Sequence, residues 1–298
     1  MKQFRFKKLD AFATEHSGGN PAGMISLDTL AEISATEMLQ IARELRGFVN
    51  EVGFVCRTGK DRLALRYYSA EKEVLFCGHA TIAILYDLLN TDPELKGLPQ
   101  IHIDTANSGL VAENRIDQEK AVFISSPAPT FSAQDIESAA IAQALRIAPS
   151  AISSHLPTAR INAGLETLLV PIGTLETTLA IQPDERHLKQ FCEEHGIDII
   201  TIFTDATARP DTSWRSRVFA PRFGYLEDPA TGSGNAALGQ YLLQHGLWQG
   251  KTLSIEQNSE RTHANIVKLM ARFPPNSSPQ VLFGGGAITR IEGSYFLQ

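Results

Sequence analysis

The feature that most constrains this fold is an internal repeat between the two halves of the chain. Two segments, 78–89 and 234–245, are apolar almost all round, and they are opened by Gly78-His79 and by Gly232-Ser233. A helix that is apolar on every side belongs in the interior of a domain, not on its surface. An offset of 154 residues also aligns the surroundings of the two segments: Glu73 with Glu227, Cys77 with Thr231, and Ala83 with Ala237. This agreement predicts a duplicated domain.

Composition excludes several classes of protein. The 298 residues carry a net charge of −6 without a basic stripe, which argues against a nucleic-acid partner. No apolar run approaches the roughly 20 residues that span a bilayer, so we expect no membrane partner. The amino terminus is basic without an apolar stretch, unlike a secretory signal. Three widely spaced cysteines without a CxxC pair argue against a disulfide framework and against a zinc site. We therefore expect a cytoplasmic protein that holds no metal.

The two helix starts are candidate anion sites. The first turn of a helix leaves backbone N–H groups without partners, and the helix dipole adds partial positive charge there. Two such starts facing one cleft between the domains would hold a small carboxylate from both sides. A simpler interpretation is that Ser233 only caps its helix, since serine is a preferred capping residue. His79 fits that interpretation less well, because histidine is not a favoured cap.

An acidic turn precedes the second helix start. Residues 227–233 read EDPATGS, and Pro229 fixes a turn that can direct Asp228 back at the helix. The alternative is that Asp228 only stabilises the helix by its charge, an effect worth ~0.3–1 kcal/mol.

Three motifs resemble the signatures of the PhzF-like (phenazine biosynthesis) family. They are LDAF at 9–12 followed by GGNPAG at 18–23, FCGHAT at 76–81, and EDPATGS at 227–233. The resemblance implies an α+β protein with the diaminopimelate-epimerase-like fold. In that fold two pseudo-symmetric domains each wrap a mixed, mostly antiparallel sheet around a central helix. We expect the domains to be 1–118 and 119–280, with 281–298 returning to the first, and the assembly to be a homodimer. The Ser/Pro-rich segment 125–132 is the candidate linker.

The same resemblance implies the site residues. Glu51 would be the principal acid/base, although it lies in Asn-Glu-Val where the family usually has Ser-Glu-Thr. Substrate binding and assisted proton transfer would fall to the side chains of His79, Asp228 and Ser233. The remaining site residues implied for substrate binding are the loop residue Asn20 and two that present backbone N–H groups, Gly78 and Gly232.

The function implied is that of a cofactor-independent isomerase. It would move a proton between carbons of a small carboxylated substrate by Glu/Asp acid–base chemistry. Because carbon acids are weak, we expect burial to raise the pKa of Glu51 toward working pH. The helix starts would stabilise the negative charge that develops.

Four other functions fit parts of the sequence. A two-thiol epimerase or racemase needs a second thiolate, but the repeat partner of Cys77 is Thr231, whose hydroxyl is too weak an acid. Epimerisation by the carboxylates stays open, as does a catalytically inactive protein that binds small acids. Residues 232–237 fit the dinucleotide pattern GxGxxA, but Asp228-Pro229 stands where the strand of that motif would run.

Overall fold

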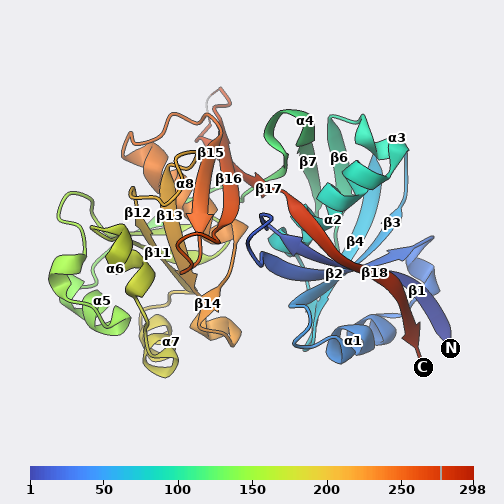
Figure 1. The fold of residues 1–298 in the computed structure, drawn as a ribbon, viewed down its shortest axis with the longest axis horizontal. Coiled ribbons are helices and arrows are strands. Elements are labelled where there is room, and N and C mark those ends of the chain that lie inside the picture. The colour runs from blue at the N-terminus through green and yellow to red at the C-terminus, as the bar shows by residue number, and fades with distance from the viewer. Residues whose placement is uncertain (276) are drawn as a thin grey trace. The chain divides into compact units, whose positions relative to one another are not determined.

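The computed structural model describes residues 1–275 and 277–298, and it divides the chain into two compact units (Figure 1). Unit 1 comprises Met1–Ser125 with Gly284–Gln298, and unit 2 comprises Ser126–Phe283. The division therefore falls at the start of the segment expected to be a linker. That segment also contains a short strand, β9 (Thr130–Ser132), which pairs with β10 (Ala159–Asn162).

Unit 1 is a mixed α+β structure. Its strands are β1 (Lys2–Ala11), β2 (Asn20–Leu27), β3 (Glu51–Arg57), β4 (Arg62–Ser69), β5 (Glu73–Val74), β6 (Gln100–Asp104), β7 (Gly109–Arg115), β8 (Ala121–Ser125) and β18 (Ala287–Leu297). Its helices are α1 (Ala35–Glu44), α2 (Gly78–Thr91), α3 (Pro93–Lys96) and α4 (Ile116–Glu119), with a 3-10 turn η1 (Leu30–Glu32). The pairs β2–β3 and β4–β6 are parallel, and the others are antiparallel.

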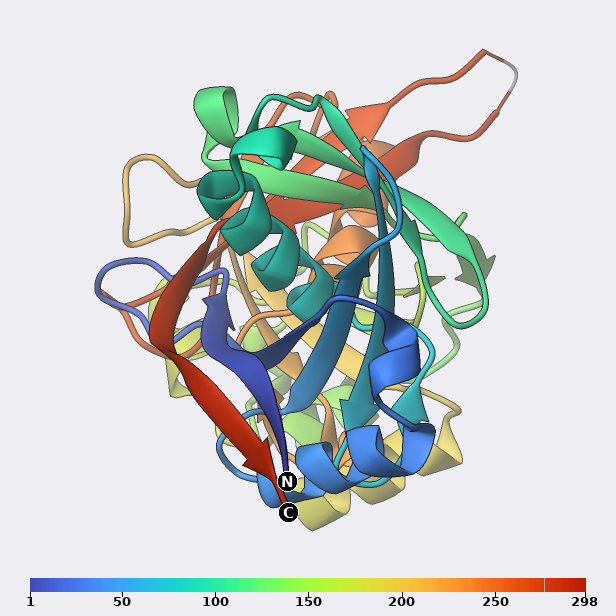
Figure 2. The same cartoon turned by 90° about the vertical axis from the view of Figure 1, so that its right-hand side faces the viewer.

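Helix α2 forms the centre of unit 1. It packs against β1, β2, β3, β8 and β18, so strands contact it from several directions (Figure 2). Eight of its residues are buried, from Ala80 to Leu89. The two termini of the chain lie side by side, because Lys2 at the start of β1 pairs with Leu297 at the end of β18 (Figure 2). The prediction of a buried helix is confirmed.

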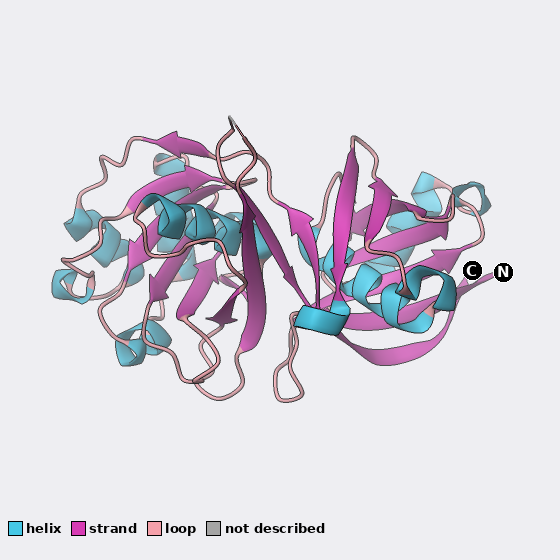
Figure 3. Ribbon diagram, turned by 90° about the horizontal axis from the view of Figure 1, so that it is seen from above, coloured by secondary structure: helices cyan, strands magenta, loops and turns pink. Residues whose placement is uncertain are grey.

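Unit 2 is likewise a mixed α+β structure (Figure 3). Besides β9 and β10, its strands are β11 (Glu166–Pro171), β12 (Ile199–Thr204), β13 (Trp214–Phe219), β14 (Glu227–Asp228), β15 (Leu253–Gln257) and β16 (Asn265–Arg272), while β17 (Gln280–Gly285) contains the point of division. Its helices are α5 (Ser138–Leu145), α6 (Leu175–Ala180), α7 (Glu185–Glu194) and α8 (Gly232–Gln244), with 3-10 turns η2 (Pro149–Ala151) and η3 (Pro221–Phe223). Helix α8 packs against β10, β11, β12 and β16, and it begins at Gly232, as the sequence predicted.

Strand register confirms the internal repeat. In unit 1, β4 pairs with β5 so that Tyr68 lies opposite Glu73; in unit 2, β13 pairs with β14 so that Phe219 lies opposite Glu227. Each short strand leads into the buried helix, and the next strand then pairs in parallel with β4 or β13. The two glutamates that the 154-residue offset matched thus hold the same place in the two units.

Candidate active site

Glu51 meets the start of α2. It is the first residue of β3, in register with Ala22 on the parallel strand β2 and with Ser69 on β4. Its Oε2 lies 3.2 Å from Nε2 of His79, the second residue of α2. The two side chains are 22% and 13% exposed, so the pair is partly accessible to solvent. A glutamate and a histidine 28 positions apart in sequence are therefore in direct contact.

The protonation of this pair differs from the expectation. Burial alone would raise the pKa of Glu51, but the hydrogen bond and positive charge of His79, with a hydrogen bond from Cys77, lower that pKa below its ordinary value of 4.5. The prediction of a raised pKa for Glu51 is wrong, because the sequence did not reveal that His79 would lie against it. Glu51 is a carboxylate at neutral pH.

His79 shows the reciprocal shift. Burial would lower its pKa, but electrostatic interaction and hydrogen bonding with Cys77 and with Glu51 raise the pKa well above its ordinary value of 6.5. Burial raises the pKa of the Cys77 thiol, so this thiol remains protonated around neutral pH. The Glu51 carboxylate is therefore the ionised partner of His79 at that pH.

Cys77 itself is a small buried residue beside the pair. Its Sγ lies 3.5 Å from Nδ1 of His79 and 3.9 Å from Oε2 of Glu51. Its backbone occupies the N-cap of α2, and its side chain makes no capping hydrogen bond within the described part of the chain. A thiol with a raised pKa and little exposure is a poor nucleophile, which agrees with a packing role.

Asn20 is hydrogen-bonded to Asn50, the residue before Glu51. Asn20 is buried at the start of β2, and its Oδ1 accepts a hydrogen bond of 2.9 Å from Nδ2 of Asn50. Asn50 thereby fixes the entry to β3, and this is one of the positions at which the sequence departs from the family pattern. Just before Asn20, Gly19 has φ of +66°, and a Cβ there would lie 2.7 Å from the Ala11 carbonyl oxygen, so the turn requires glycine.

In unit 2, Asp228 and Ser233 flank the start of α8. The Asp228 carboxylate accepts the Ala230 N–H at 3.3 Å, so the turn at Pro229 folds back as predicted. The N-cap is Thr231, and Ser233 is the second residue of the helix, with its hydroxyl 3.2 Å from that of Thr231. The interpretation of Ser233 as a plain cap is therefore wrong. At Gly232 a Cβ would collide with the Phe283 ring, so only glycine fits the first position of α8.

The acidic turn is held by residues that sequence reasoning missed. Gln257, buried at the end of β15, accepts hydrogen bonds from the Thr231 N–H (3.0 Å) and Asn235 Nδ2 (2.6 Å), and it donates to the Asp228 carbonyl (2.9 Å). Arg217 forms a two-bond ion pair with Glu227, at 2.9 and 2.8 Å. The repeat matched Glu227 to Glu73, so it could have indicated Glu227, but no local motif indicates Gln257.

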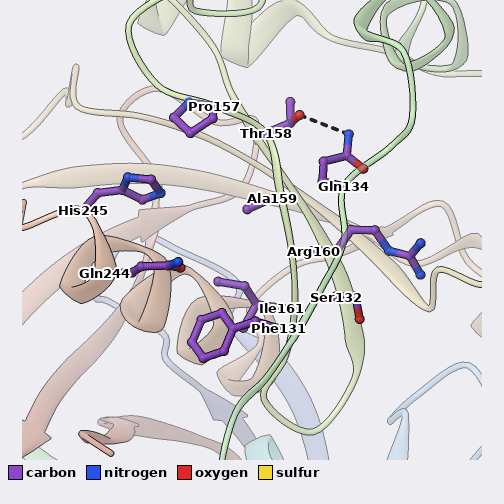
Figure 4. A pocket seen from close by; sticks show the side chains of 10 residues that line it. All are labelled: Phe131, Ser132, Gln134, Pro157, Thr158, Ala159, Arg160, Ile161, Gln244 and His245. Carbon is purple, nitrogen blue, oxygen red and sulfur yellow. Dashed lines mark hydrogen bonds between the residues drawn. The ribbon is translucent and has the colours of Figure 1, made fainter.

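A cavity elsewhere in unit 2 does not belong to this group. Its volume is about 200 Å³, and it lies among β9, β10 and the carboxyl-terminal end of α8 (Figure 4). Gln244 and His245 line it, at the other end of the helix from Gly232 and about 20 Å away at 1.5 Å per residue. The structure thus brings Glu51, Gly78 and His79 together in unit 1, and Asp228, Gly232 and Ser233 together in unit 2.

Comparison with known proteins identifies the family. The family of phenazine biosynthesis-like proteins (PhzC-PhzF) matches residues 9–293, nearly the whole chain. The protein belongs to this family. Its fold is the expected diaminopimelate-epimerase-like fold, an α+β structure. A solved PhzF-family protein from Bacillus anthracis is similar with a TM-score of 0.88 at 22% identity, covering 100% of both chains.

Two curated relatives of this PhzF-family protein carry isomerase names. The "uncharacterized isomerase YfhB" of Bacillus subtilis is 27% identical over 87% of this chain and 88% of its own length. The trans-2,3-dihydro-3-hydroxyanthranilate isomerase of Pseudomonas chlororaphis is 29% identical over 97% of this chain and 98% of its own length. Among the described residues, no helix is long and apolar enough to cross a membrane.

Proposed function

We propose that this protein is a cofactor-independent isomerase that moves a proton between carbons of a small carboxylated substrate. The observation that carries the proposal is the ion pair of Glu51 with His79 at the start of the buried helix α2. The isomerase names of its family relatives support the same class of reaction.

Glu51 acts as the base. It is ionised at neutral pH, so it can accept a proton from carbon without first losing one. A carbon next to an unsaturated or carboxylated centre leaves negative charge on the substrate when its proton is removed. His79, held protonated by Glu51, and the N–H groups of the first turn of α2 stabilise this charge. The proton then returns to a different carbon.

Unit 2 supplies the second set of groups. We assign to Ser233 and to the backbone N–H of Gly232 the binding of the substrate carboxylate at the start of α8. Asp228 either takes part in proton transfer or orients the substrate. Asn20 contributes to substrate binding from unit 1.

Epimerisation by the carboxylates is the second candidate, because a base that removes a proton can also return it to the other face of the same carbon. A two-thiol epimerase is disfavoured for two reasons. The residue of the second repeat that corresponds to Cys77 is Thr231, which has no thiol, and the pKa of Cys77 is raised. The carbon that takes up deuterium distinguishes the two carboxylate reactions: a different carbon for the isomerase and the original carbon for the epimerase.

The decisive experiment follows deuterium from solvent into a substrate. Small unsaturated carboxylates, including trans-2,3-dihydro-3-hydroxyanthranilate, are first screened for thermal stabilisation of the protein. Glu51→Gln keeps the size of the side chain and removes the base. The rate of deuterium exchange into the substrate, measured by mass spectrometry, should therefore fall by at least ~10²-fold. Glu73→Gln, an exposed position in the same unit, is the matched control and should exchange at the wild-type rate. Unchanged exchange in Glu51→Gln would refute the assignment of the base.

We also propose the cytoplasm as the compartment and a homodimer as the assembly. The three cysteines, Cys56, Cys77 and Cys192, are free thiols in the described structure, which agrees with a reducing compartment. The homodimer stays a prediction, and light scattering at micromolar concentration tests it.

A further inference from the structure

Three different metal-ligating atoms converge at the start of α2. They are the Glu51 carboxylate, the Cys77 thiol sulfur and a ring nitrogen of His79, all within 4.8 Å of one another. The sequence predicted no metal site, because its three cysteines are widely spaced and form no CxxC pair. The cluster forms only because β3 and α2 meet.

The separations of these atoms suit one tetrahedral ion. Glu51 Oε2 and His79 Nε2 are 3.2 Å apart, the Cys77 sulfur is 3.5 and 3.9 Å from the two His79 nitrogens, and it is 3.9 Å from Oε2. Two ligands of one Zn²⁺ ion, each ~2.0–2.3 Å from it at tetrahedral angles, lie roughly 3.3–3.6 Å apart. Shifts of a few tenths of an ångström would therefore close the three atoms on a common ion.

Exposure leaves room for a fourth ligand. Cys77 is buried, whereas the side chains of Glu51 and His79 are 22% and 13% exposed. Three protein ligands with one position open to water are the arrangement of zinc sites that keep a coordination place free. The mixed set of sulfur, nitrogen and oxygen also favours Zn²⁺ over Mg²⁺ or Ca²⁺, which prefer oxygen ligands.

Charge balance favours the ion as well. A thiolate and a carboxylate carry two negative charges, which neutralise one divalent cation. The start of α2 opposes this with a partial positive charge of about half a unit, which is smaller than the charge that the two anions supply.

We propose that Glu51, Cys77 and His79 bind one Zn²⁺-class ion, and that this ion inhibits the enzyme by coordinating Glu51. The inhibition rests on the function proposed above, but the binding does not, since it requires no substrate. In binding, the Cys77 thiol loses its proton to solvent and its sulfur forms the bond to the ion. His79 loses its proton likewise and donates a ring nitrogen.

Binding is tested with Co²⁺ as a spectroscopic substitute for Zn²⁺. Titration of the full-length protein should give a thiolate-to-cobalt charge-transfer band in the near ultraviolet that saturates at one ion per chain. Added Zn²⁺ should abolish the band. Cys77→Ser should lose it, while Cys192→Ser, which removes a buried thiol from unit 2, should keep it.

Affinity separates the site from incidental binding to a thiol. His79→Gln and Glu51→Gln keep the thiol, yet each should weaken Zn²⁺ binding in calorimetry by at least the ~10–100-fold that loss of an outer-shell partner costs. Circular dichroism checks that each variant is folded. Absence of the cobalt band, its survival in Cys77→Ser, or wild-type affinity in both His79→Gln and Glu51→Gln would overturn the proposal.

The outcomes also separate the two proposals. One-to-one metal binding by a protein without any exchange activity would support the proposed metal site and contradict the proposed isomerase function. Exchange activity that Zn²⁺ does not inhibit, in a protein that binds it, would overturn the inhibition.

Discussion

The starts of α2 and α8 have the same backbone arrangement but carry different side chains. Each follows a two-residue strand, opens with glycine and carries a polar side chain at its second position, His79 in unit 1 and Ser233 in unit 2. The N-cap is Cys77 in one and Thr231 in the other. The duplicated fold thus provides two helix starts of the same form, and of their second residues only His79 is ionisable.

The carboxylates come from positions that do not correspond in the repeat. Strand register places Val52 opposite Tyr68 and Ile200 opposite Phe219, so the residue in unit 2 that corresponds to Glu51 is Ile199. Likewise Asp228 lies opposite Val218 where unit 1 has Val74 opposite Tyr67. Each unit therefore contributes one acid from a place where its partner has an aliphatic residue. The symmetry of the fold does not extend to the proposed chemistry.

The largest effect that tests this comparison is expected at Asp228. Asp228→Asn removes the carboxylate of unit 2, so deuterium exchange into a bound substrate should fall by at least ~10², the lower range for loss of an acid–base group. Asp211→Asn, on the surface of the same unit, is the control and should exchange normally. Wild-type exchange in Asp228→Asn would mean that unit 1 alone performs the proton transfer.

The supports beneath the two helix starts should differ in their contribution to stability. Gln257→Leu removes the side-chain oxygen that accepts hydrogen bonds from both the Thr231 N–H and the Asn235 amide. The free energy of unfolding should therefore drop by at least ~2 kcal/mol. Tyr67→Phe removes one hydrogen bond to Thr81, which still donates to the Cys77 carbonyl, and should cost ~1 kcal/mol. Urea unfolding measures the loss of stability in both variants. Equal losses in Gln257→Leu and Tyr67→Phe would contradict the expected difference between the two helix starts.

Cys77 tests whether unit 1 works by its thiol. If Cys77 only packs, Cys77→Ser should keep most of the exchange activity and lower the free energy of unfolding by at most ~1–2 kcal/mol. The mechanism is decided by which variant loses more exchange activity, Cys77→Ser or Asp228→Asn. Loss of turnover in Cys77→Ser with full turnover in Asp228→Asn would make the thiol the acid/base and end the proton-shift proposal.

The smallest effect is expected from the pH dependence of stability at His79. Because the pKa of His79 is raised in the folded state, its contribution is fully present below its ordinary pKa of 6.5 and is lost as pH rises through the raised value. The Glu51 carboxylate, whose pKa is lowered, loses its contribution only as pH falls below 4.5 through the lowered value. The stability difference between wild type and His79→Gln should therefore be largest between these limits. A difference that grows toward alkaline pH in thermal unfolding would contradict the ion pair.

By itself, the sequence determined the architecture of this protein. Apolar residues on every side of 78–89 and 234–245 leave no surface face, so both segments had to become central helices. The matched glutamates, glycines and helices then implied the duplication that the strand register confirms. These properties follow from local composition and spacing, which a linear pattern contains. The importance of Glu51 came from the family resemblance, since the residue alone looks like an exposed strand end.

Only the tertiary structure decided how the site is charged and held. The pKa of Glu51 falls because His79, 28 residues away, lies 3.2 Å from it, and that distance depends on how β3 packs against α2. Gln257 reaches the Asp228 turn because β15 pairs in parallel with β13 after the chain has passed through α8. Parallel pairing across a helix, and the contact of a strand start with a helix start, are set by packing between segments distant in sequence, so no local pattern encodes them.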